Sequence, residues 1–281
     1  MIGTPSFRRS RRTRRAWRRN GSLVLALAIL LAYSWTVWQA RRGAADPVWQ
    51  RIQATGVLRV GTDPGFAPFA LEQRGAWDGY DVALAREVAQ RLGLRAEFVA
   101  MSYDSLYPKL EAGDVDLLAS ALPLAPEQGW RARFSAAYLD AGLVLVTRAD
   151  SAITDETLLA GQRVGAALGS DGDTALRRLQ RTTPAINANS AYALPTNALA
   201  ALQQGALDAV LTDAISALEV TQRDPHFHIA RSLSFEPYVL AMPITAYQLQ
   251  SQVNRVLDDL HREGFIAQLN ARWFGDPQIG D

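Results

Sequence analysis

The chain of 281 residues contains no cysteine. That absence excludes a disulfide scaffold, a cysteine nucleophile, a cysteine zinc site and the lipid-modified N-terminal cysteine of a lipoprotein. Histidines number only three, and no His-Glu-x-x-His motif, phosphate loop or Gly-x-Ser-x-Gly motif occurs. His226 and His228 lie two residues apart, but no acid is spaced to complete a metal site with them. We therefore expect no metal, no cofactor and no catalytic residue.

Acidic residues are missing from the first 45 positions, which contain ten arginines. The rest of the chain carries 19 basic and 28 acidic residues, a net charge of −9. The whole-chain charge of +1 therefore conceals a basic leader and an acidic remainder. Because the part expected to fold is acidic, we expect no nucleic-acid partner.

Residues 21–40 contain no charged side chain and are mostly apolar. A helix of this length spans roughly 30 Å of hydrocarbon. The positive-inside rule predicts an Arg-rich cytoplasmic leader at 1–20, a transmembrane signal-anchor at 21–40, and an extracytoplasmic location for the remainder of the chain. The alternative is a cleaved signal peptide, which would leave the protein secreted. We favour the anchor because the apolar run exceeds the usual signal core.

After an expected linker at 41–51, short apolar runs alternate with helical patterns. Strands are predicted at 57–61, 96–100, 116–120, 143–147, 163–167, 208–212 and 238–242. Helices are predicted at 81–92, 195–204 and 246–263, the first with Asp81 as its N-cap. This alternation implies an α/β fold with mostly parallel sheets flanked by helices.

Seven segments succeed one another in an informative order: LRVGTDPGFAPFAL (58–71), GYDVALAREVAQRLG (79–93), YDSLYPKLEAGDVDLL (103–118), RFSAAYLDAGLVLVTR (133–148), GQRVGAALGSD (161–171), GALDAVLTDA (205–214) and VNRVLDDLHREGFIAQLNARWFG (253–275). Their order and spacing resemble those of the family 3 bacterial extracellular solute-binding proteins, whose best-known members bind polar amino acids for ABC importers. One position departs, because Ala83 stands where that family usually has an acid.

The resemblance implies a two-lobed, type II periplasmic-binding-protein-like fold. Lobe 1 would hold residues 52–139 and 239–281, and lobe 2 would hold residues 142–236. A small polar solute, cationic or amino-acid-like, would bind in the cleft between them and be delivered to an ABC permease in the membrane. Binding would close the hinge, because the solute touches both lobes only in the closed state.

The aromatic cage of the family falls on Phe66 and Tyr103, although both rings could instead belong to the core. Asp63 ends the first predicted strand, where ligands gather in parallel α/β lobes. Its carboxylate either accepts a hydrogen bond from the ligand or forms an Asx-turn before Pro64. Asp213 matches an acid that accepts the ligand's ammonium group in amino-acid-binding relatives, and its alternative role is a helix N-cap.

The carboxylate-binding side of the family's site does not match. Gln128 stands where the family has an arginine, and Pro123, with Ala121 before it, stands at a small hydroxyl position. Ser170 and Asp171 occupy a loop that usually reads Gly-Ser-Thr. A ligand carboxylate there would lack its cation and meet a like charge. The sequence therefore predicts a cationic or neutral-polar solute over an ordinary α-amino acid.

Two other functions remain open on the resemblance alone. One is a periplasmic dehydratase acting on prephenate-like or arogenate-like acids, and the other is a sensor lobe that signals to a membrane partner. A dehydratase needs a general acid and a site for carboxylates. Because the arginine of that carboxylate site is replaced by Gln128, we expect a binding protein and not an enzyme.

Overall fold

The computed structural model describes residues 29–30, 32–35 and 46–275, of which the first two short ranges are helical. Within these ranges, no helix is both long enough and apolar enough to cross a bilayer. The predicted leader at 1–20 lies outside the described residues, and so does most of the predicted anchor at 21–40. The structure therefore does not show the expected transmembrane helix.

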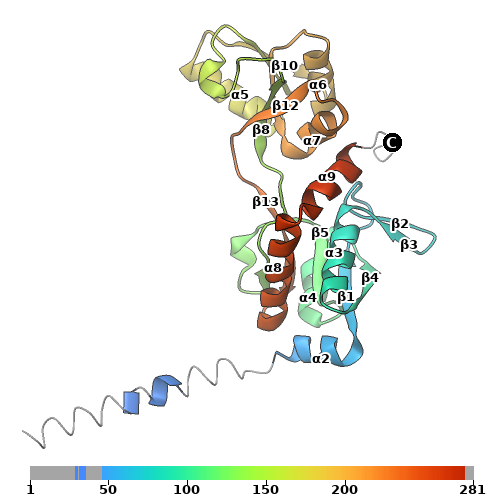
Figure 1. Cartoon of the computed structure of the whole chain (residues 1–281). Coiled ribbons are helices and arrows are strands. Elements are labelled where there is room, and N and C mark those ends of the chain that lie inside the picture. The colour runs from blue at the N-terminus through green and yellow to red at the C-terminus, as the bar shows by residue number, and fades with distance from the viewer. Residues whose placement is uncertain (1–28, 31, 36–45, 276–281) are drawn as a thin grey trace, which may run out of the picture. The chain divides into compact units, whose positions relative to one another are not determined.

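The first lobe is built on a six-stranded sheet in the order β4-β1-β5-β13-β6, with β7 paired to β13 (Figure 1). Its strands are β1 (Val57–Thr62), β4 (Arg95–Ala100), β5 (Leu117–Pro123), β6 (Ala132–Phe134), β7 (Leu139–Asp140) and β13 (Pro237–Pro243). A separate hairpin joins β2 (Leu71–Gln73) to β3 (Ala76–Asp78). One core cluster contains the buried faces of α2 (Pro47–Thr55), α3 (Tyr80–Arg91), α8 (Tyr247–Arg262) and α9 (Phe265–Gly275). A second cluster contains α4 (Leu106–Ala112).

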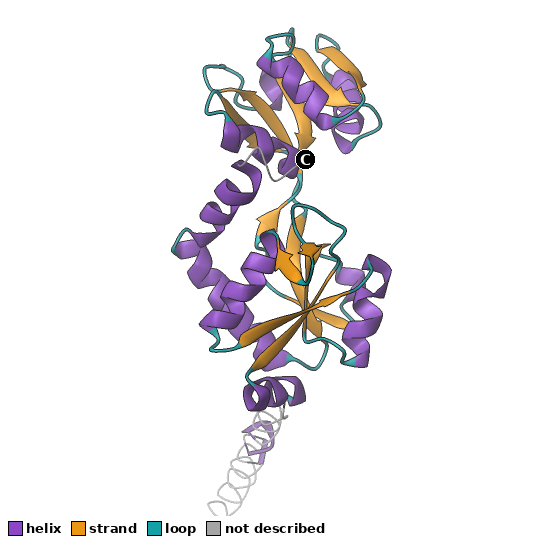
Figure 2. Cartoon of the chain, turned by 90° about the vertical axis from the view of Figure 1, so that its right-hand side faces the viewer, coloured by secondary structure: helices purple, strands orange, loops and turns teal. Residues whose placement is uncertain are grey.

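The second lobe is built on a five-stranded sheet in the order β10-β9-β11-β8-β12 (Figure 2). Its strands are β8 (Leu143–Arg148), β9 (Arg163–Ala167), β10 (Asn187–Tyr192), β11 (Ala209–Asp213) and β12 (Phe227–Ser232). Its helices are α5 (Asp171–Thr182), α6 (Pro195–Gln203) and α7 (Ala214–Arg223). The two faces of β11 pack into two different core clusters. Val210 packs with α6 and α7, and Leu211 packs with α5. A strand that is covered on both faces needs the continuous apolar run seen in the sequence.

All seven predicted strands and all three predicted helices are present, with ends shifted by no more than three residues. The two-lobed α/β fold is confirmed, but the expectation of mostly parallel sheets is wrong. Only β4-β1-β5 and β10-β9-β11 are parallel, and β13 and β8 pair antiparallel to their neighbours. The cause is connectivity: β8 and β13 enter directly from the other lobe, without the helical crossover that a parallel neighbour requires.

Two local expectations also need correction. Helix α2 begins at Pro47, inside the stretch 41–51 expected to be linker, because Val48, Trp49 and Ile52 pack against the lobe 1 core. The N-cap of α3 is Gly79 and not Asp81. The Asp81 carboxylate points inward instead and accepts a hydrogen bond from the Ala121 N–H.

The two strand crossings between the lobes are tied to each other. Asp140 Oδ1 accepts hydrogen bonds from the N–H of Gly142 on one crossing and of Glu236 on the other, both at 2.9 Å. A Cβ at Gly142 would lie 2.4 Å from the Ser234 carbonyl oxygen, so only glycine allows this approach. Beside the crossings, α7 contacts α9 (Figure 1).

We predict that Gly79→Ala destabilises the fold far more than Gly113→Ala. Both glycines have positive φ, of 131° and 78°. A Cβ at Gly79 would also lie 2.3 Å from the Phe69 carbonyl oxygen, whereas nothing lies within 4 Å of one at Gly113. In urea denaturation, Gly113→Ala should cost about 1 kcal/mol, the cost of a left-handed conformation for a residue with a Cβ, and Gly79→Ala about 3 kcal/mol or more. Equal costs for the two variants would show that the Phe69 carbonyl does not restrict position 79 to glycine.

Candidate functional site

Lobe 1 carries a cavity of about 410 Å³ beside the carboxyl ends of β1 and β5. It is lined by Asp63, Gly65, Phe66, Tyr103, Ala121, Pro123 and Tyr238. Five residues singled out from the sequence therefore lie together. Tyr238 was not anticipated, because it lies beyond the second crossing and is far away in sequence.

The Asp63 carboxylate is committed to the backbone of two loops. Its Oδ1 accepts from the Gly65 N–H at 2.9 Å, which is the Asx-turn geometry, and its Oδ2 accepts from the Tyr103 N–H at 3.0 Å. Asp63 thus joins the loop that carries Phe66 to the loop that carries Tyr103. These bonds position the two rings, and Asp63 also lines the cavity.

The two rings are too exposed to be ordinary core. Phe66 is 48% and Tyr103 is 52% exposed, and Phe66 stacks on the buried Phe69 at a centroid distance of 5.5 Å. Burial raises the pKa of Tyr238 to about 12, so its hydroxyl remains a hydrogen-bond donor at neutral pH. Exposed aromatic faces in a pocket attract flat or cationic groups.

Ala121 lies in the pocket wall with φ of 45°, a left-handed conformation that residues with a Cβ rarely adopt. The fully buried Asp81 supports it, because the Asp81 Oδ2 accepts the Ala121 N–H. The aspartate of the Gly-Tyr-Asp motif therefore acts beneath the pocket, by fixing the backbone that forms its floor.

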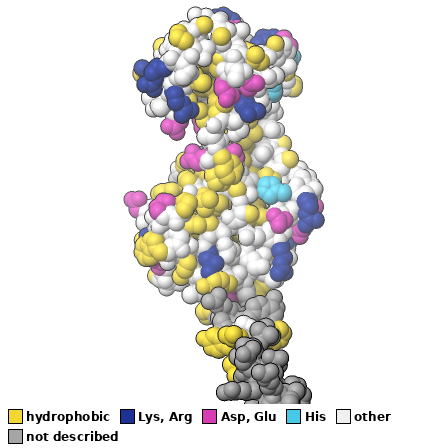
Figure 3. All heavy atoms as spheres, turned by 90° about the vertical axis from the view of Figure 1, so that its left-hand side faces the viewer, with side chains coloured by type: hydrophobic (Ala, Val, Ile, Leu, Met, Phe, Trp, Pro, Cys, Tyr) yellow, Lys and Arg dark blue, Asp and Glu magenta, His cyan; other side chains and the backbone are white. Residues whose placement is uncertain are grey.

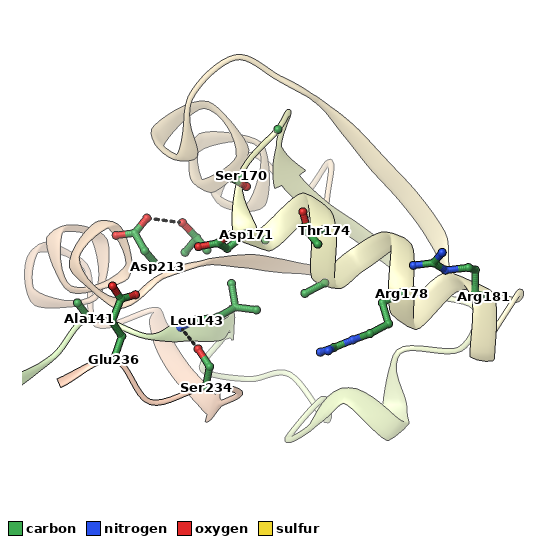
Figure 4. Close-up of a pocket in the computed structure, with 14 residues that line it drawn as sticks. Ala141, Leu143, Ser170, Asp171, Thr174, Arg178, Arg181, Asp213, Ser234 and Glu236 are labelled. Carbon is green, nitrogen blue, oxygen red and sulfur yellow. Dashed lines mark hydrogen bonds between the residues drawn. The ribbon is translucent and has the colours of Figure 1, made fainter. Parts of the chain in front are cut away.

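Lobe 2 carries a larger cavity of about 590 Å³ (Figure 4). Its lining includes the predicted residues Ser170, Asp171 and Asp213. It also includes residues that the sequence did not single out, among them Glu236, Arg178 and Arg181. Three of its side chains are acidic and two are basic, so the cavity can hold charge of either sign.

Asp213 has the N-cap role that the sequence left open, and it also lines the cavity. It is the N-cap of α7, since its Oδ1 accepts from the Ser216 N–H at 2.8 Å. The Thr212 hydroxyl donates to its Oδ2 at 3.3 Å, and the side chain lines the cavity (Figure 4). A carboxylate oxygen has more than one lone pair, so a cap leaves capacity for a ligand donor.

Ser170 is the N-cap of α5 and uses its hydroxyl within the lobe. It accepts from the Asp173 N–H at 3.2 Å and donates to the Ala167 carbonyl at 2.7 Å. Asp173 is buried, and the Arg177 guanidinium lowers the pKa of its carboxyl well below the usual range. Asp171, in contrast, is exposed to the cavity at the first position of the helix.

Gln128 lines neither of these two pockets. It lines an adjoining cavity of about 450 Å³, which shares Tyr103 and Pro123 with the lobe 1 cavity and also includes Tyr107 and Arg131. Arg131 is paired with Glu111 at 2.7 Å, and Arg133 donates to the Ile244 carbonyl at 2.8 Å. Neither arginine therefore replaces the missing carboxylate-binding residue in the lobe 1 cavity.

Apart from the two arginines, the linings of the lobe 1 and lobe 2 cavities together favour a positively charged or polar group. On the face shown in Figure 3, acidic and apolar side chains gather where the lobes meet. Asp171, Asp213 and Glu236 supply negative charge from lobe 2 and its crossing, and Phe66 and Tyr103 supply aromatic faces from lobe 1. A charge-assisted bond to one of these carboxylates is about twice as strong as a neutral one.

The chain forms two α/β lobes that are joined by two strand crossings, and each lobe has a pocket. This arrangement defines a two-lobed binding protein. The sequence profile of the bacterial extracellular solute-binding proteins, family 3, matches residues 58–276. The chain belongs to that family.

Individual relatives agree with this assignment. A probable amino-acid ABC transporter-binding protein of Haemophilus influenzae is 26% identical over 242 residues, which cover 82% of this chain and 90% of that protein. The L-cystine-binding protein of Bacillus subtilis is 25% identical over 250 residues, which cover 85% and 89%. A crystal structure of a polar amino acid ABC uptake transporter substrate-binding protein from Streptococcus thermophilus matches with a TM-score of 0.71 at 24% identity, covering 85% of this chain and 94% of that one. This structural match shows that the two proteins share a fold.

We predict that Asp81 makes stability fall as pH rises. Burial raises its pKa to about 7, and the hydrogen bond from Ala121 offsets this only in part. The unfolded carboxyl has a pKa of about 4, so its contribution is fully present below about pH 4 and is lost progressively up to about pH 7. In urea denaturation from pH 4.5 to 8, the wild type should lose roughly 3 kcal/mol of stability through this carboxyl, and Asp81→Asn should abolish that loss.

The matched control is Asp114→Asn, which changes an exposed carboxylate of the same lobe. It should leave the pH dependence unchanged. If the wild type and Asp81→Asn show parallel pH profiles, Asp81 does not titrate as the buried geometry implies.

Proposed function

We propose that this protein captures a small polar solute outside the cytoplasm and delivers it to an ABC-type importer. The observation that carries the proposal is the pair of pockets, one on each lobe of a chain that matches the family over residues 58–276. The solute would first contact one lobe and then hold both lobes together. The closed form would be the one that the permease recognises.

The hinge of this movement is the pair of crossings at β7–β8 and β12–β13. Asp140 holds the two crossings together through Gly142 and Glu236, so they would bend as one element. Glu236 also lines the lobe 2 cavity, which connects the hinge directly with the solute site. Lobe 1 would comprise residues 52–139 and 239–281, and lobe 2 residues 142–236.

The preferred solute carries a cationic group. Aromatic rings on lobe 1 and acids on lobe 2 would surround that group, and Gln128 leaves the usual carboxylate-binding position without a cation. Polyamines, quaternary amines and modified amino acids meet these requirements. Free glutamate or glutamine does not, because its α-carboxylate would lie beside Asp171.

We predict that Asp213→Asn weakens binding of a cationic solute by roughly 10- to 100-fold, the loss expected for one charge-assisted hydrogen bond. Asparagine caps helices as well as aspartate does, so the thermal stability should hardly change. Isothermal calorimetry against putrescine, choline, arginine, glutamine and glutamate measures the effect. Asp114→Asn, with the same charge change on lobe 1, is the control. Nanomolar binding of glutamate or glutamine, with no binding of any cation, would overturn the proposed preference.

The same proposal places the folded part at the outer face of the cytoplasmic membrane, held by residues 21–40. Residues 1–20 would remain in the cytoplasm because of their arginines. The binding protein would then be confined to the surface of the membrane that contains the permease.

We predict that the full-length chain fractionates with membranes after a carbonate wash. Added protease should digest the part after residue 46 from the periplasmic side, because the anchor exports it. Mass spectrometry of the recovered protein reports its first residue. A soluble product that begins near Ala44 or Ala45 would show that the leader is cleaved instead.

A further inference from the structure

The lobe 2 cavity has a basic end as well as an acidic one. Asp171, Asp213 and Glu236 gather at one end, and Arg178 and Arg181 lie farther along α5 (Figure 4). The preference for a cationic group accounts for the acids only. It leaves two arginines in the wall of the same cavity without a role.

Helical geometry places these side chains on one face. Asp171, Thr174, Arg178 and Arg181 are spaced at i, i+3, i+7 and i+10 along α5, and all four line the cavity. At about 1.5 Å of rise per residue, Arg178 lies about 10 Å and Arg181 about 15 Å beyond Asp171 along the axis. Side chains on a helix lean toward its N-terminus. Figure 4 shows both guanidinium groups reaching back in that direction.

Neither arginine is used elsewhere in the part of the chain that the structure describes. The side chains of Arg178 and Arg181 form no ion pair or hydrogen bond there, and both are exposed. The adjacent Arg177 shows the contrast. It does not line the cavity, and its Nε donates to Asp173 at 2.7 Å. The two cavity arginines therefore keep their guanidinium donors available for a ligand.

We propose that Arg178 and Arg181 bind an anionic group at the far end of the same solute, which makes that solute an elongated zwitterion. This inference rests on the proposed function, because the acidic end must hold the solute's cation. The α-ammonium and α-carboxylate of an amino acid lie on one carbon, so that pair cannot reach both ends of the cavity, and only a cationic side chain such as that of lysine would supply the distant charge. A solute with a terminal amine, an extended middle and a terminal carboxylate can reach both ends. Guanidinium is suited to this task, because its fork of donors matches a carboxylate.

A homologous series of ligands tests the separation of charge. Calorimetry would compare 6-aminohexanoate and 8-aminooctanoate with hexylamine and octylamine, which lack the carboxylate, and with 1,6-diaminohexane, which replaces it by a second cation. In the wild type, at least one ω-amino acid should bind about tenfold or more tightly than the matching alkylamine. The diamine should gain nothing over the alkylamine.

The double variant R178Q/R181Q tests the residues. It should bind the alkylamines as the wild type does and lose the advantage of the ω-amino acids. The matched control is R95Q/R255Q, with the same change in charge on lobe 1, where Arg95 and Arg255 line neither pocket. Because all four side chains lie on the surface, both variants should fold, and their thermal unfolding transitions check this.

The outcomes separate the two proposals. If alkylamines bind but the carboxylate adds nothing, or if its benefit survives in R178Q/R181Q, the anionic subsite is refuted and the cationic site stands. If no amine in the series binds, the cationic site itself is refuted, and the inference that depends on it fails with it.

Discussion

One carboxylate oxygen helps to tie together the two strand crossings that join the halves of this protein. Asp140 Oδ1 accepts an N–H from each strand crossing, so Gly142 and Glu236 are bonded to the same atom. The same junction contains the close approach of Gly142 to the Ser234 carbonyl, and it holds Glu236 beside the lobe 2 cavity. A charged acceptor makes these backbone bonds stronger than neutral ones, which suits a junction that must bend without separating.

In the pockets, acidic side chains hold the backbone that shapes the cavity. Asp63 fixes two loops, Asp213 begins a helix, and Asp81 supports Ala121 from below. A carboxylate held in this way loses little side-chain entropy when a solute arrives, because folding has already ordered it. We therefore expect the pockets to be rigid on each lobe, and the movement in binding to belong to the crossings.

The sequence predicted most of the fold because buried strands leave continuous apolar runs such as 143–147. It did not predict sheet direction, since an apolar run does not record whether a strand comes after a helix or a crossing.

For the site, the position of each residue in its motif indicated five residues that do line one cavity of lobe 1: Asp63, Phe66, Tyr103, Ala121 and Pro123. Gln128 lies in the adjoining cavity, which shares Tyr103 and Pro123 with the lobe 1 cavity. Arg177 and Arg178 look alike in the sequence, and only the packing of α5 shows that one pairs with Asp173 while the other lines the cavity.

Asp213 caps a helix and also lines the lobe 2 cavity, and this has a consequence for the rest of the molecule. Helix α7 starts at this residue and contacts α9, which belongs to the opposite lobe. A solute held by the Asp213 carboxylate, as proposed, would act on the first turn of a helix whose side touches α9. Occupancy of the cavity would then affect a surface that the solute does not reach.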